Sequence, residues 1–188
     1  MKSVGIIFGR FNPPHKGHRV AWQMASENNY WYVGTNKNTI GPKDPLPYDT
    51  KIEIMEAIWP KVKEHIVSEQ SWLTLASMVY KTHGNVKLNV YTDEAWVYKA
   101  LVEYNNIHHK PHGFYSFDNL ALVLTPRLSS ATDLRNAAIT NDPIAFELAA
   151  GVDSKLLINN KSFFEIVAKY LKGYNNEHRR PKEISRSK

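Results

Sequence analysis

The chain has 188 residues and an apolar fraction of 43%, which suits one domain around a single hydrophobic core. It contains no cysteine, which excludes disulfides, thiolate metal ligands and cysteine nucleophiles. The net charge of +6 suits anionic partners, while no segment approaches the roughly 18 uncharged apolar residues that a membrane span needs. The apolar run over 4–8 ends at Arg10 without a small-residue cleavage site, so it indicates a buried strand rather than a signal peptide. We therefore expect a cytoplasmic protein with no membrane partner.

Strand-length apolar runs alternate with stretches of helical period along the whole chain. This pattern is typical of a parallel sheet covered by helices on both faces. The first half predicts a strand over 4–8, a helix over 16–28, a strand over 30–33 and a helix over 48–59 that Pro60 interrupts or ends. Between the last two lies a loop over 35–47, and a loop of this length in a compact domain is more often functional than idle.

The second half continues the alternation and ends in a charged segment. Helices are expected over 71–82, 93–104, 130–138, 143–149 and 162–171, and strands over 86–91 and 120–124. The loop between 104 and 120 carries three histidines, which lack a carboxylate at metal-ligand spacing and are interpreted as exposed loop residues. We predict one domain over 1–175, followed by a basic flexible tail over 176–188.

A first candidate site is the segment 9–18, GRFNPPHKGH, between the first strand and the first helix. Ligands of open α/β sheets bind at this point, and a helix N-terminus offers amide donors and partial positive charge to phosphates. Gly9 permits close approach of the backbone. His15 and His18 occupy positions whose side chains project to the same side of a helix, and with Lys16 they could neutralise charge on a phosphate oxygen during transfer. Either histidine alone could instead be a capping residue.

A second candidate site is the segment 128–135, LSSATDLR. Ser130 and Asp133 have the spacing of a capping box, which predicts a second helix start. Ser130, Thr132 and Arg135 would gather hydroxyls, amides and a guanidinium there. Alone this is only a helix cap, but two such helix starts after sheet strands could hold one triphosphate between them. Phosphoryl chemistry requires mainly positioning and charge neutralisation from the protein.

Together these motifs resemble the His-x-Gly-His nucleotidylyltransferase superfamily. GRFNPPHKGH looks like the signature of nicotinamide mononucleotide adenylyltransferases, and SATDLR looks like the Ser-Ser/Gly-Thr-x-x-Arg second motif. The segments 91–94, 104–106, 134–138 and 141–146 (YTDE, YNN, LRNAA and NDPIAF) look most like cytidylyltransferase-like proteins of large tailed phages, which would place the protein in the host cytoplasm. The resemblance implies a single-domain, doubly wound, Rossmann-like parallel sheet of about five strands. It also implies in-line attack of an acceptor phosphate on the α-phosphorus, with Mg²⁺ on the triphosphate and no metal ligand from the protein.

The resemblance also implies roles for individual residues. The predicted catalytic residues are His15, His18, Lys16 and Arg135, and the predicted nucleotide-binding residues are Gly9, Arg10, Phe11, Asn12, Gly17, Ser130 and Thr132. Acceptor contacts are expected from Asp93, Trp96 and Lys51. Asp93 follows a strand, and the alternative role for Trp96 is packing in the core. Lys51 ends a segment, DPLPYDTK, that is similar to one in archaeal-type enzymes, where the pair Glu-Arg stands in place of Thr50 and Lys51.

The sequence therefore predicts a nucleotidylyltransferase. It would transfer a nucleoside monophosphate, AMP rather than CMP, from ATP or CTP to a phosphorylated small molecule such as nicotinamide mononucleotide, releasing pyrophosphate. The alternative is a catalytically silent nucleotide-binding fold whose basic tail engages nucleic acid. A fragment of a class I aminoacyl-tRNA synthetase shares the His-x-Gly-His helix start, but the chain is too small and lacks a Lys-Met-Ser-Lys-Ser-like loop. The long loop and the tryptophans leave homo-oligomerisation open.

Overall fold

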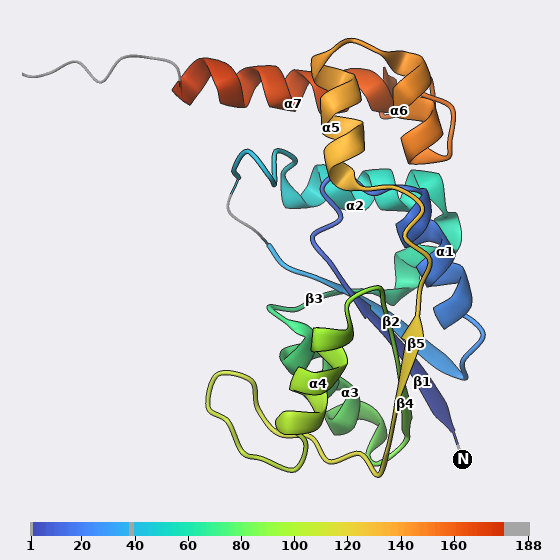
Figure 1. Cartoon of the computed structure of the whole chain (residues 1–188), viewed down its shortest axis with the longest axis vertical. Helices are drawn as coiled ribbons and strands as arrows, with labels where there is room; N and C mark the ends of the chain where they lie inside the picture. The colour runs from blue at the N-terminus through green and yellow to red at the C-terminus, as the bar shows by residue number, and fades with distance from the viewer. Residues whose placement is uncertain (1, 38–39, 179–188) are drawn as a thin grey trace, which may run out of the picture.

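A parallel five-stranded sheet forms the centre of the molecule (Figure 1). The computed structural model describes residues 2–37 and 40–178, and the side chains of these residues up to 173. Its strand order is β3-β2-β1-β4-β5, with every neighbouring pair parallel. The strands are β1 (Ser3–Phe8), β2 (Tyr30–Thr35), β3 (Ile66–Ser68), β4 (Lys87–Thr92) and β5 (Asn119–Leu124). The chain proceeds outward from β1 in one direction and then from β4 in the other, so the switch point of the sheet lies between β1 and β4.

Helices cover both faces of this sheet (Figure 1). They are α1 (Lys16–Ala25), α2 (Tyr48–Ile58), a 3-10 helix η1 (Pro60–His65), α3 (Trp72–His83), α4 (Ala95–Glu103), α5 (Ala131–Ile139), α6 (Pro143–Ala150) and α7 (Phe163–His178). A small hairpin of β6 (Leu157–Ile158) and β7 (Lys161–Ser162) precedes α7. Figure 1 shows α3 and α4 on one side of the sheet, α1 on the other, and α5, α6 and α7 beyond the ends of the strands.

The alternation of side chains along β1 divides the core in two. Val4 and Ile6 pack with the buried faces of α3 and α4, whereas Ile7 packs with α1, α2 and the C-terminal helices. Successive strand residues point to opposite faces, so a run that is apolar at every position is buried on both sides. The doubly wound α/β fold predicted from the sequence is confirmed.

Side-chain caps fix where several helices begin. The predicted capping box of α5 is present: the Ser130 hydroxyl accepts from the Asp133 amide, and the Asp133 carboxylate accepts from the Ser130 amide. Ser71 and Thr74 make the same reciprocal arrangement at α3. Such caps satisfy backbone donors that the first helical turn leaves without partners. The second candidate motif therefore does begin a helix.

Some element boundaries differ from those expected. The helix predicted over 16–28 ends at Ala25. The Asn28 side-chain amide donates to the Ala25 carbonyl at 2.8 Å, and a further helical turn would need this carbonyl as the acceptor of a backbone amide. Strand β3 and the hairpin of β6 and β7 were not expected, because these strands are too short to show a periodic pattern in the sequence. Helix α7 reaches His178, and residues 179–188 of the predicted tail lie outside the described residues. No helix in the described ranges is long and apolar enough to cross a membrane.

Candidate active site

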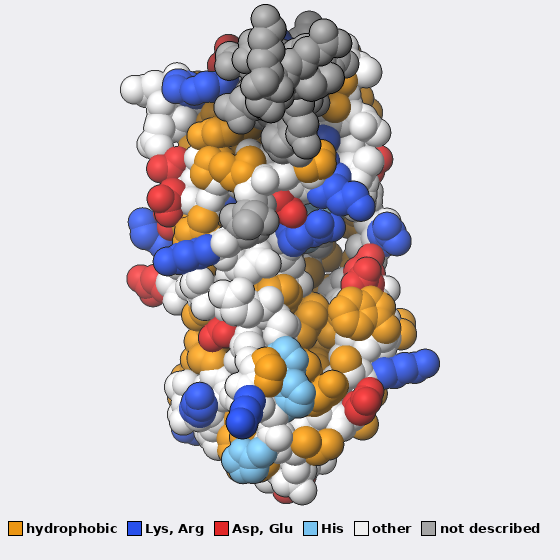
Figure 2. All heavy atoms as spheres, turned by 90° about the vertical axis from the view of Figure 1, so that its left-hand side faces the viewer, with side chains coloured by type: hydrophobic (Ala, Val, Ile, Leu, Met, Phe, Trp, Pro, Cys, Tyr) orange, Lys and Arg blue, Asp and Glu red, His pale blue; other side chains and the backbone are white. Residues whose placement is uncertain are grey.

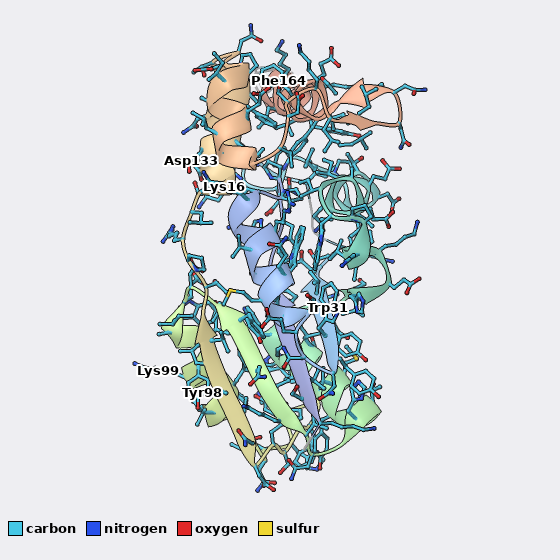
Figure 3. The ribbon with its side chains drawn as sticks, turned by 90° about the vertical axis from the view of Figure 1, so that its right-hand side faces the viewer. Lys16, Trp31, Tyr98, Lys99, Asp133 and Phe164 are labelled. Carbon is cyan, nitrogen blue, oxygen red and sulfur yellow. The ribbon has the colours of Figure 1, made fainter. Side chains whose placement is uncertain are left out.

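A cavity of about 200 Å³ lies at the carboxyl ends of β1, β4 and β5, at the switch point of the sheet. It is bordered by the beginnings of four helices, α1, α3, α4 and α5, and by the loop after β5. Its lining comprises Ile7, Phe8, Phe11, His15, Gly17, His18, Ala21, Trp72, Tyr91, Thr92, Asp93, Glu94, Thr125, Pro126, Arg127, Ser129, Ser130 and Ala131. Figure 3 shows the first turns of α1 and α5, marked by Lys16 and Asp133, next to each other. The structure thus brings the two candidate motifs to one cavity.

His15 is the N-cap of α1, and its hydrogen bonds fix its tautomer. Its Nδ1 accepts from the Gly17 amide at 3.2 Å and lies 3.1 Å from the Ser129 hydroxyl. Because a backbone N–H can only donate, Nδ1 must carry the lone pair, so the neutral ring has its hydrogen on Nε2. A Cβ at Gly17 would lie 3.1 Å from the His15 ring, so any larger residue would have to shift the ring by a few tenths of an ångström.

His18 is held in the same tautomer. Its Nδ1 accepts from the backbone N–H of His15 at 3.2 Å, so its Nε2 also carries the hydrogen. The two imidazoles stack with their centroids 3.6 Å apart. The rings of Phe11 and His18 meet edge to face, with their centroids 4.7 Å apart. Phe11 adopts a positive φ of 49°, and a Cβ on Gly9 would lie 2.9 Å from its ring, so Gly9 makes room for Phe11. Both rings can therefore act as Nε2–H donors.

Burial keeps both imidazoles neutral. It lowers the pKa of His15 to about 4, despite the opposing attraction of Asp133 and Asp93. The pKa of His18 lies well below its ordinary value, chiefly through burial and secondly through His15. At neutral pH the pair offers two N–H donors without a positive charge.

Lys16 points away from the cavity. Its ammonium donates to the carbonyl of Leu148 near the end of α6, at 2.7 Å, and the residue is not part of the cavity lining. Successive helix residues are separated by about 100° around the helix axis. Since His15 and His18 project to the same side of α1, Lys16 projects to a different side. The ammonium thereby joins α1 to α6.

Arg135 connects α5 to the first motif and to the loop over 36–47. Its guanidinium donates to the Asn12 carbonyl at 2.8 Å, to the Lys43 carbonyl at 3.3 Å and to the Thr132 hydroxyl at 2.9 Å. Burial, followed by the nearby Arg10, lowers the pKa of Arg135. Neither Arg135 nor Thr132 lines the cavity. Arg135 lies beside it, on the side of the loop.

Two further residues of the first motif fasten the same loop. The side chain of Asn12 donates to the Leu46 carbonyl at 3.0 Å and accepts from the Leu46 amide at 2.9 Å. Arg10 pairs with Asp44 at 3.5 Å and has a side chain that is 57% exposed. Lys and Arg side chains gather across the middle of the face in Figure 2, at the height of α2 in Figure 1. The loop therefore joins both motifs within a basic region.

The residues expected at an acceptor lie in three different places. Asp93 lines the cavity, with its carboxylate 3.9 Å from the Arg127 guanidinium. Trp96 is 60% exposed outside the cavity, and its indole donates to the Glu94 carboxylate at 3.0 Å, so it is not a core residue.

Lys51 is fully buried at the base of the loop. Its ammonium donates to the Thr35 hydroxyl at 2.9 Å and to the Asn36 carbonyl at 3.0 Å. Burial lowers its pKa to about 8, against the attraction of Asp44. It is not part of the cavity lining.

Several residues of the cavity were not among the predicted site residues, including Ser129, Arg127 and Trp72. Ser129 lies within the segment 128–135 and Arg127 directly precedes it, so their position after the last strand was an available signal. Trp72 follows the cap of α3, and only the strand order, which the sequence does not state, brings that helix start to the same place. Within the described ranges, no group of three or more His, Asp and Glu side chains is placed to hold a metal ion.

No protein-family model matches the sequence, and neither does any curated protein. Solved structures, however, share its architecture. Nicotinic acid mononucleotide adenylyltransferase of Plasmodium falciparum, complexed with APC, has a TM-score of 0.54 and 12% identity, covering 93% of this chain and 96% of that chain. The same enzyme complexed with NaAD has a TM-score of 0.48 and 12% identity, and the match covers 79% of this chain and 94% of that chain. A protein described as a nicotinate-nucleotide adenylyltransferase of Vibrio parahaemolyticus has a TM-score of 0.47 and 14% identity, and the match covers 91% of this chain and 99% of that chain. At such identities the likeness concerns the fold: this chain has the Rossmann-like fold of the nucleotidylyltransferases.

Proposed function

We propose that the protein is a nucleotidylyltransferase that transfers a nucleoside monophosphate to a phosphorylated small molecule and releases pyrophosphate. The observation that carries the proposal is the meeting of the starts of α1 and α5 at one cavity, with His15, His18 and Ser130 all in its lining. Helix N-termini bind phosphates through free amides and the helix dipole. The fold shared with the Plasmodium enzyme, whose structure was solved with the ligand APC, supports the same activity.

In the proposed reaction, an oxygen of the acceptor phosphate attacks the α-phosphorus of the nucleoside triphosphate in line. The new bond joins this oxygen to the α-phosphorus, and the bond from the α-phosphorus to the bridging oxygen breaks, so that pyrophosphate leaves. The Nε2–H groups of His15 and His18 donate to the oxygens on which charge develops. The protein positions reactants and stabilises charge without forming a covalent intermediate.

Positive charge would come from groups around the cavity. Arg127 lines it, while Arg10 and Arg135 lie beside it at the loop over 36–47. We propose that Arg135, with the hydroxyls of Ser130 and Thr132, binds the β- and γ-phosphates once it exchanges the Lys43 carbonyl for phosphate oxygens. Lys16 would reach a phosphate only by leaving the Leu148 carbonyl.

Mg²⁺ is proposed to arrive on the triphosphate, where it would shield the charge of the β- and γ-phosphates. The carboxylates of the cavity lining are Asp93 and Glu94. Oxygen ligands of this kind suit Mg²⁺, which usually takes one or two carboxylates together with substrate phosphates. The resemblance implied no metal ligand from the protein, but Asp93 and Glu94 are the residues that would hold the ion here.

We propose ATP rather than CTP as the nucleotide, and nicotinamide mononucleotide is the first acceptor to test. Pyrophosphate release would be measured with Mg²⁺, each nucleoside triphosphate and a panel of phosphorylated acceptors. We expect release in at least one mixture and none with a His15→Asn/His18→Asn double variant of unchanged circular dichroism. No release from any mixture would favour the silent nucleotide-binding alternative. Salt-sensitive nucleic-acid binding that truncation after His178 abolishes would support that alternative directly.

A further inference from the structure

Ser129 joins the second candidate motif to the first. It lies in the loop between β5 and α5, is 114 residues from His15 in the sequence, and has its hydroxyl oxygen 3.1 Å from His15 Nδ1. Since the Gly17 amide already requires Nδ1 to be an acceptor, the hydroxyl must be the donor in this contact. No protein partner of His15 Nε2 is found among the described residues, and the ring lines the cavity.

The Ser129 contact differs in kind from the other contacts of His15. The Gly17 amide and the stacked His18 ring both belong to α1, so they hold His15 relative to its own helix. Ser129 comes from the other helix start and therefore holds the ring relative to Ser130 and the first amides of α5. A ring that donates to a phosphate must be fixed relative to both helix starts, because misplacement by about 1 Å can cost a hundredfold in rate.

We propose that Ser129 is a positioning residue for His15: its hydroxyl adds a second donor to Nδ1, which the Gly17 amide already makes an acceptor, and holds the ring in place relative to α5 with Nε2 left to donate to a substrate phosphate. The consequence for catalysis rests on the proposed function, whereas the tautomer and orientation of His15 do not. Partners that bind the second nitrogen of a functional imidazole commonly set its tautomer and direction in this way.

The Ser129 hydroxyl also affects how easily His15 is protonated, because charged groups lie around the ring. Burial is the largest influence on His15 and lowers its pKa; Asp133 on α5 and Asp93 after β4 favour the protonated form, while Lys16 on α1 opposes it. Protonation places a hydrogen on Nδ1 and removes the acceptor that Gly17 and Ser129 share. A donor at Nδ1 therefore stabilises the neutral ring against the two carboxylates. Removing the hydroxyl should make His15 easier to protonate.

The test uses the full chain with Ser129→Ala, Ser129→Thr and, as a matched control, Ser26→Ala. The Ser26 hydroxyl donates to the Gln23 carbonyl at the other end of α1, away from the cavity. Long-range ¹H–¹⁵N NMR of the imidazoles reads the tautomer and titration midpoint of His15 without any substrate. We expect Ser129→Ala to shift the Nδ1 resonance toward that of a weaker acceptor and to raise the midpoint by about half a pH unit, the equivalent of one ordinary hydrogen bond. Ser129→Thr and Ser26→Ala should leave both unchanged.

Kinetics with the best substrate pair add a second measurement. We expect Ser129→Ala to lower kcat about three- to tenfold with little change in the KM of the nucleotide, and Ser129→Thr to restore it. An unchanged His15 spectrum and midpoint in Ser129→Ala, or a Ser129→Thr spectrum like that of Ser129→Ala, would overturn the inference. If no substrate pair reacts, the proposed function fails, but the NMR result still decides the role of Ser129.

Discussion

The imidazoles of His15 and His18 lie face to face, with 3.6 Å between centroids and 29° between their planes. Two protonated rings would repel each other strongly at this distance in a buried site. Burial lowers the pKa of both rings, and the presence of His15 lowers that of His18 further. The stack therefore favours two neutral rings, each with its donor on Nε2. This relationship makes the pair a surface of neutral N–H donors rather than a cationic one.

Replacing His18 should affect turnover far more than stability. In His18→Asn, the side-chain oxygen can still accept from the His15 backbone N–H, so the cap of α1 is retained while the Nε2–H donor is lost. We expect kcat to fall by about a hundredfold or more, with a small change in the thermal midpoint. Pyrophosphate release and thermal unfolding measure the two effects. His83→Asn, at the far end of α3, is the control and should leave turnover unchanged; a collapse of the thermal midpoint in His18→Asn would mean that the ring is structural.

Acid should destabilise the protein through the stacked pair. The pKa of His15 is lowered to about 4 in the folded chain, whereas an unfolded histidine titrates near 6.5, so between these pH values the unfolded chain binds more protons. The free energy of unfolding should therefore decrease as the pH falls through this window, by up to about 1.4 kcal/mol per pH unit for each such histidine. Above the window these groups have no effect. Urea unfolding at several pH values should show a shallower slope for His15→Gln, while His108→Gln, on the exposed loop, should keep the slope of the unaltered chain.

Removing the side chain of Asn12 should loosen the loop over 36–47. Asn12→Ala loses both hydrogen bonds to Leu46 and leaves buried backbone groups unpaired, which should cost about 2 kcal/mol of unfolding free energy. Trypsin should then cleave after Lys43 faster than in the unaltered chain. Asn136→Ala, on the exposed face of α5, serves as the control. Equal cleavage rates in Asn12→Ala and the unaltered chain would show that the loop is held by its other contacts.

Lys51 should make stability depend on pH in alkaline solution. Its pKa is lowered to about 8 by burial, and an unfolded lysine titrates near 10.4, so the unfolded chain binds more protons in between. The free energy of unfolding should therefore gain a positive contribution as the pH rises from about 8 to 10. This contribution should vanish in Lys51→Met and persist in Lys155→Met, where the lysine is exposed. Urea unfolding across this range measures it, and an identical slope in Lys51→Met would assign the dependence to other groups.

The sequence predicted what depends on local pattern. The alternation of apolar runs identified the sheet and most helices, and the spacing of Ser130 and Asp133 identified the start of α5. Contacts between distant segments could not be predicted in this way. The bond from Arg135 to the Asn12 carbonyl and the bond from Ser129 to His15 exist only because the strand order brings β1, β4 and β5 together. Helical geometry alone, by contrast, could have indicated that Lys16 faces away from His15 and His18.

The placement of the second motif after β5 has a consequence for biosynthesis. All strands of the main sheet are complete by Leu124, whereas Ser129, Ser130 and Arg135 emerge from the ribosome afterwards. A chain that ends just after β5 lacks these residues and also the part of the core around Ile7 that α5, α6 and α7 supply. Nonsense mutations just beyond β5 should therefore yield fragments that carry the first motif but no complete cavity.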